Sequence, residues 1–167
     1  MGRFMKRIIR SSIVAATTAL ISNIFNLSET KVGKILGIAI PMITFFTADD
    51  PKISDLIFKD SKKKRDKRKK KDGGFLTPKE AEDNFFNIFG DKGHTMSKFI
   101  AKETDSTEEE VNGVLGMTFS VMEAGFGRLI EEDEVDEKGF NQLLKGEVEE
   151  QKKKKPSLFR TFTKMMF

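Results

Sequence analysis

The amino-acid sequence predicts an all-α protein, a multihelical fold in which a basic linker joins two related helical modules. No stretch shows the sustained alternation of apolar and polar residues that a half-buried strand requires, and one segment occurs twice. Residues 27–38 read LSETKVGKILGI, and residues 106–117, 79 positions later, read STEEEVNGVLGM. Apolar residues recur at equivalent positions, as in the pairs Val32 and Val111, Ile35 and Val114, and Leu36 and Leu115. Because packing positions repeat and reactive groups do not, the repeat predicts architecture rather than a reaction.

Composition limits the classes of function. The chain has 167 residues, of which 38% are hydrophobic, enough to bury the core of one domain or of two small ones. The absence of cysteine excludes disulfides, thiolate zinc sites and cysteine nucleophiles. His94 is the only histidine, and no serine and base are arranged around it, so we expect no metal, no cofactor and no enzymatic activity. The 16 phenylalanines stand against no tyrosine and no tryptophan, and such fully apolar rings should mostly fill the core.

Charge is distributed unevenly along the chain. Residues 1–71 carry 17 basic and 6 acidic side chains, whereas residues 72–167 carry 13 basic and 20 acidic ones. The two halves should attract each other, either as a clasp within one molecule or head to tail between molecules. Much of the positive charge comes from nine candidate contacts for an anionic surface, Lys62, Lys63, Lys64, Arg65, Lys67, Arg68, Lys69, Lys70 and Lys71.

The first module covers residues 1–60 and should contain three helices. One is predicted over residues 3–25. Ser28 has the hydroxyl of an N-cap and starts a second helix that runs to about residue 47. Pro41 lies inside this helix, where it removes one backbone hydrogen bond and should kink the chain. The Asp-Pro pair at 50–51 starts a short third helix that should end at Phe58.

Residues 61–76 form the predicted linker, and residues 77–150 the second module. The linker has almost no apolar side chain to bury, so we expect a solvated segment without regular structure. Capping boxes at 77–80 and 107–110 should each start a helix, the first of which stops at Gly90. A further helix is expected over residues 94–104, and the acidic stretch 131–137 should be a loop.

Residues 151–167 form a separate basic tail with an amphipathic pattern. Its apolar residues fall on one face of a helix, and basic residues border that face. We interpret the apolar residues as candidate anchors for a protein partner or an anionic membrane: Leu158, Phe159, Phe162, Met165 and Met166.

The repeat resembles a known bacterial family. One helix reads Ser-Glu-x-x-Val-Gly-x-x-Leu-Gly-x-x-x-Pro over 28–41, the segment after the linker reads FFNIFG over 85–90, and a second Val-x-x-x-Leu-Gly helix begins at Val111. In this two-copy order, residues 15–146 resemble the YidB-like proteins, known as domain of unknown function 937. The resemblance implies a multihelical, cytoplasmic-type protein without an assigned activity. The family's connector is usually rich in Gly and Leu, whereas here it is almost entirely basic.

Three motifs admit a second interpretation. The Gly-x-x-Gly at 90–93 is similar to the phosphate-clamping loop of a KH domain, but no strands flank it, so a helix cap and turn is favoured. The acidic stretch lacks the spacing of a calcium loop, which favours a solvated loop. Residues 11–28 carry no charge but are rich in Ser, Thr and Asn, which favours an internal helix over a signal peptide or membrane span.

These observations together predict a non-enzymatic helical binding or scaffold protein. We expect it in the cytoplasm or peripheral to the inner membrane, with its tail docked on a protein partner or an anionic membrane surface. One alternative is an electrostatic nucleic-acid-binding protein that uses the basic run. Another is a membrane-embedded protein that inserts its N-terminal apolar helices. The sequence does not specify the oligomeric state.

Overall fold

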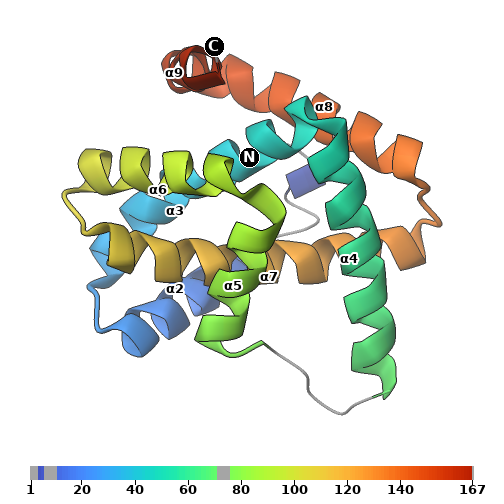
Figure 1. The fold of residues 1–167 in the computed structure, drawn as a ribbon, viewed down its shortest axis with the longest axis horizontal. Helices are drawn as coiled ribbons and strands as arrows, with labels where there is room; N and C mark the ends of the chain where they lie inside the picture. Colours follow the sequence, from blue (N-terminus) through green and yellow to red (C-terminus); the bar gives the residue numbers. More distant parts are fainter. Residues whose placement is uncertain (1–3, 6–10, 71–75, 167) are drawn as a thin grey trace.

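The computed structural model describes residues 4–5, 11–70 and 76–166, and these residues confirm the all-α fold (Figure 1). They contain no strand. The helices are α2 (Ser11–Phe25), α3 (Glu29–Asp49), α4 (Pro51–Lys70), α5 (Pro78–Phe89), α6 (Asp91–Thr104), α7 (Glu108–Glu132), α8 (Glu137–Lys154) and α9 (Pro156–Met166).

Helix starts lie where the capping residues predicted them. The Ser28 hydroxyl accepts a hydrogen bond from the backbone N–H of Lys31 at 3.1 Å and caps α3. Both capping boxes are formed, Thr77 with Glu80 at the start of α5 and Thr107 with Glu110 at the start of α7. In each box the two side chains satisfy amide groups that the first helical turn leaves without partners.

The basic run is helical, which corrects the prediction of an unstructured linker. Helix α4 does not end at Phe58 but continues through Lys70. Lysine and arginine are good helix formers, and cations near the C-terminus of a helix complement its dipole, so this segment keeps helical geometry without apolar residues to bury. Lys62 and Lys63 are exposed, the side chains of residues 64–70 lie outside the described part, and so does Lys71.

Three other boundaries differ from the predictions. Helix α6 begins at Asp91 instead of His94, because Gly90 takes a positive φ of 57° and starts the new helix directly after α5. Helix α7 runs through Glu132 and α8 starts at Glu137, so the acidic loop is shorter than predicted. The first predicted helix is described only from Ser11 onward, apart from residues 4–5, which are buried.

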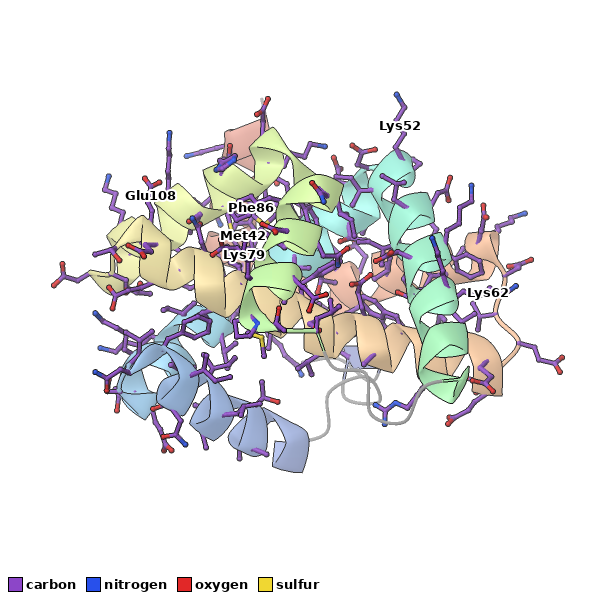
Figure 2. The ribbon with its side chains drawn as sticks, turned by 60° about the horizontal axis from the view of Figure 1, so that its bottom comes forward. Met42, Lys52, Lys62, Lys79, Phe86 and Glu108 are labelled. Carbon is purple, nitrogen blue, oxygen red and sulfur yellow. The ribbon has the colours of Figure 1, made fainter. Side chains whose placement is uncertain are left out.

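One hydrophobic core is shared by both halves of the chain. Helix α3 packs on α8 and α6, and α7 makes the corresponding contacts with α4 and α2. Phe126 of α7 and Phe140 of α8 meet at a ring distance of 5.2 Å, and Phe140 also contacts Phe58 of α4 at 5.9 Å. Figure 2 shows Met42 of α3 inside the molecule and Lys52 of α4 extending from it. The two segments predicted to be modules therefore do not fold around separate cores.

The C-terminal tail is part of this core, which corrects the prediction of a separate segment. Phe159 and Phe162 of α9 are buried and lie 5.8 and 5.7 Å from the ring of Phe45 in α3. Leu158 and Met165 are partly buried against the same core, and the Met166 side chain is outside the described part. The apolar face of α9 is thus already covered by the chain itself.

Candidate ligand-binding cavity

A lysine compensates for the proline in the middle of α3. Pro41 has no backbone N–H, so the carbonyl of Gly37, one turn earlier, loses its helical donor. The ammonium of Lys155 donates a hydrogen bond to this carbonyl oxygen at 3.1 Å. Lys155 is the C-cap of α8 and directly precedes α9. The end of α8 is therefore attached to α3 at the carbonyl group that Pro41 leaves without a helical donor.

A cavity of about 270 Å³ lies beside this contact, between α2, α3 and the end of α8. Its wall is mainly apolar, with polar side chains contributed by α2 and by the end of α8. The lining residues are Thr18, Gly33, Leu36, Gly37, Ile40, Pro41, Gln151, Lys154 and Lys155. Leu36 and Ile40 are buried, whereas both glycines are exposed, so the cavity opens to solvent along α3.

Gly33 and Gly37 keep this cavity open. A Cβ atom at either position would meet no other atom within 4 Å, and neither glycine has a positive φ. Gly116 of α7 is different, because its Cβ would lie 2.6 Å from the backbone nitrogen of Glu82. A glycine inside a helix costs about 1 kcal/mol of stability relative to alanine. Neither packing nor backbone conformation requires Gly33 and Gly37, and a side chain at either position would enter open space beside the cavity.

Gln151 lines the cavity and holds an unused acceptor inside the protein. Its side chain is only 4% exposed. The amide nitrogen donates to a carboxylate oxygen of Glu147 at 2.8 Å, but the amide oxygen accepts no hydrogen bond from the described residues. Buried polar atoms in proteins nearly always have a partner. This oxygen has almost no accessible surface, so it is enclosed by the protein and does not face the cavity.

Lys155 places a positive charge at the edge of the cavity. An ammonium has three N–H donors, and the described residues offer it the Gly37 carbonyl but no carboxylate within ion-pair distance. Lys92 shows the contrasting case, since its ammonium lies 2.8 Å from Asp50 and this hydrogen bond holds the pKa of the Asp50 carboxyl below its usual range. The charge of Lys155 therefore remains available to a ligand.

Among the described residues, none of those proposed from the sequence lines the cavity. The described part of the basic run lies farther along α4, where Figure 2 shows Lys62, and the apolar residues of α9 are used for internal packing. A signal for the cavity was present in the sequence. Gly33, Gly37 and Pro41 follow one another at intervals of four residues, which places three poor helix formers on the same face of α3.

The other sequence candidates have structural roles. Gly90 caps α5 and starts α6, which confirms the predicted helix cap and turn. Lys92, inside the same motif, is paired with Asp50. His94 is exposed, and its ring stacks on Phe86 at a centroid distance of 4.6 Å. Within the described ranges, no group of three or more His, Asp or Glu side chains is arranged to hold a metal ion.

One described helix has the length and apolar composition to cross a membrane. This helix is α3, and 72% of its most apolar stretch is buried inside the molecule. Burial of this extent is typical of the central helix of a compact fold. The packing of α3 against α6, α7 and α8 favours that interpretation.

The comparisons with known proteins identify no relative. No family model matches the chain, and neither a curated protein nor a solved structure matches it. The resemblance to YidB-like proteins stays a prediction from the sequence. The fold and the cavity together define a helical protein with a small, open, mainly apolar site, and its function has to be argued from that site.

Proposed function

We propose that this chain is a non-enzymatic helical binding protein whose ligand is a small molecule with an apolar body, bound between α2, α3 and α8. The observation that carries the proposal is the pair Gly33 and Gly37, which weaken α3 and line the cavity without a packing reason. Apolar contacts to Leu36, Ile40 and Pro41 would supply most of the binding free energy.

The size of the cavity limits the ligand. Ligand sites usually measure about 300–1,000 Å³, so a cavity of about 270 Å³ is at the lower end of that range. An apolar cavity of roughly 150 Å³ can hold benzene. By that measure the site suits a molecule of about ten heavy atoms, such as an eight-carbon chain with a polar end.

The docking functions predicted from the sequence are less well supported by the structure. A partner or an anionic membrane would reach Phe159 and Phe162 only if α9 left the core. Nucleic-acid binding through α4 stays an alternative, in which the exposed Lys62 and Lys63 would contact phosphate groups. Insertion of the N-terminal helices into a membrane would require α3 to give up its contacts with helices of the second half, including α6, α7 and α8.

The first test asks whether the cavity binds an uncharged apolar probe. Octan-1-ol is titrated calorimetrically into the full chain, the Gly37→Leu variant and the Gly146→Leu variant. Gly146 is a matched control, because it is exposed inside α8, a Cβ there meets nothing within 4 Å, and it does not line the cavity. Both substitutions should strengthen their helices by up to about 1 kcal/mol.

We expect the wild type and Gly146→Leu to bind octanol with similar affinity, and Gly37→Leu to lose at least about tenfold, because the leucine fills the site. Thermal unfolding of all three proteins confirms that they are folded. Absence of octanol binding by the wild type, or equal binding by Gly37→Leu, would show that the cavity is not a ligand site.

A further inference from the structure

We infer that the ligand of this cavity is a monocarboxylate with a short apolar chain, and that Lys155 binds its carboxylate. The inference rests on the proposed function and adds the chemical class of the ligand. Three features of the described residues point to this class: the position of Lys155, the lack of a carboxylate beside it, and the apolar wall next to it.

The position of Lys155 is set by α3. Gly37 both lines the cavity and accepts the hydrogen bond from Lys155, so the ammonium is held at the edge of the apolar space. A carboxylate that accepts a hydrogen bond from this ammonium would leave its chain next to Leu36 and Ile40. The lysine does not have to release Gly37, because its remaining N–H groups are donors as well.

The charge of the site favours an anion with a single charge. Within the described part of the chain, Lys155 has a neutral carbonyl as its acceptor and no acidic neighbour at ion-pair distance. The Gly37 carbonyl is neutral and leaves the positive charge of Lys155 uncompensated, whereas a ligand carboxylate would compensate it. Lys154 also lines the cavity but already takes part in an interaction within the chain, which leaves the Lys155 ammonium to match one carboxylate.

Glu147 is the group that would favour a cation instead. It is buried and accepts the hydrogen bond from the Gln151 amide. However, Glu147 does not line the cavity. Gln151 does line it, and its amide N–H donates to the Glu147 carboxylate from the cavity side. A ligand therefore meets Lys155 before it meets any charge of Glu147.

The test compares three molecules with the same eight-carbon chain and different head groups: octanoate, octan-1-ol and octylammonium. Each is titrated calorimetrically into the full-length wild type, Lys155→Met and Lys153→Met. Methionine keeps most of the apolar stem of lysine and removes its charge. Lys153 is the matched control, because it is exposed in the last turn of α8 and does not line the cavity.

In the wild type we expect octanoate to bind about two- to fivefold more tightly than octanol, which is the size of effect for an exposed charged contact, and octylammonium to bind most weakly. Lys155→Met should remove the advantage of octanoate over octanol, whereas Lys153→Met should retain this advantage. Added salt should reduce the advantage, because it screens exposed charges.

The outcomes separate this inference from the proposed function. Equal binding of octanol and octanoate by the wild type, or an octanoate advantage that survives in Lys155→Met, overturns the carboxylate assignment while octanol binding still supports the cavity. Failure of both octanol and octanoate to bind overturns both. Octanol binding by Lys155→Met also shows that this variant remains folded around the cavity.

Discussion

Single side chains complete hydrogen bonds that the helices of this protein leave open. The Lys155 ammonium replaces the donor that Pro41 removes from α3. At the start of α7, the Glu110 carboxylate accepts a hydrogen bond from the backbone N–H of Thr107 at 2.9 Å, and the Thr107 hydroxyl accepts one from the N–H of Glu110 at 3.1 Å. Because each contact satisfies one orphan backbone group, each can be tested by one substitution.

The first prediction at this scale concerns the pH dependence of the cap on α7. The backbone hydrogen bond from Thr107 lowers the pKa of Glu110 below its ordinary value. A carboxyl with a lowered folded-state pKa stabilises the protein above its unfolded-state pKa, and this contribution is lost as the pH falls through the lowered value. Glu110→Gln should therefore be less stable than the wild type near neutral pH, and the difference should shrink in acid.

Urea unfolding of both proteins between neutral and acidic pH measures this difference. Glu109→Gln is the control, because Glu109 is exposed in the same first turn but forms no capping hydrogen bond there. A stability difference between Glu110→Gln and the wild type that stays constant over the whole pH range would contradict the ionised cap.

At the scale of helices, α5 and α7 approach each other closely at one glycine. A Cβ at Gly116 would lie 2.6 Å from the backbone nitrogen and 2.7 Å from the Cα atom of Glu82. Backbone atoms of a helix cannot move aside as the end of a flexible side chain can. Near this crossing, burial is the main cause that raises the pKa of the Glu82 carboxyl. The absence of a side chain at Gly116 therefore allows the backbones of α7 and α5 to approach this closely.

We therefore predict that Gly116→Ala destabilises the protein by about 1–3 kcal/mol, the usual cost of overpacking. The substitution improves helix propensity, so any loss comes from the forced separation of α5 and α7. Gly146→Ala is the matched control and should raise stability by up to about 1 kcal/mol, because a Cβ at Gly146 has open space. Urea midpoints that rise for both variants would disprove a close crossing.

At the scale of the whole molecule, the two halves of the chain are held together mainly by apolar packing. The contacts of α3 with α8 and α6 correspond to those of α7 with α4 and α2. Two copies of one unit around an approximate two-fold axis would produce such a pairing, so the internal repeat stays our interpretation of the sequence. Charged contacts also join the halves, between Lys31 and Glu110 and between Lys92 and Asp50, but the shared core itself consists of apolar side chains.

This arrangement predicts that the halves associate without a covalent link. Residues 1–72 and 73–167, produced together as two chains, should co-purify at low salt and also in about 1 M salt, where the screening length is only about 3 Å. A Phe140→Asp substitution in the second chain, which places a charge against buried Phe58 of the first chain, should abolish the complex at both salt concentrations. Dissociation of the unsubstituted pair by salt alone would show that charge holds the halves together.

Features that depend on a few neighbouring residues could be predicted from the sequence alone. The absence of strand periodicity, the caps at Ser28, Thr77 and Thr107, and the glycine stop after α5 agree with the structure. Each of these depends on hydrogen bonds within one or two turns, so the information lies within a short segment. The helical state of the basic run was missed because burial was weighed more heavily than the helix propensity of lysine and arginine.

Burial and the cavity were decided by the tertiary structure. An amphipathic pattern shows that one face of α9 is apolar, but only contacts with Phe45, more than a hundred positions earlier, show that this face is covered within the chain. Likewise, Gly33, Gly37 and Pro41 look like weak points of a helix until Lys155 and Gln151 are brought beside them. The sequence determined which helices form and which faces are apolar, because those are local properties. The partner of each face and the space left between helices depend on long-range packing, which local patterns do not specify.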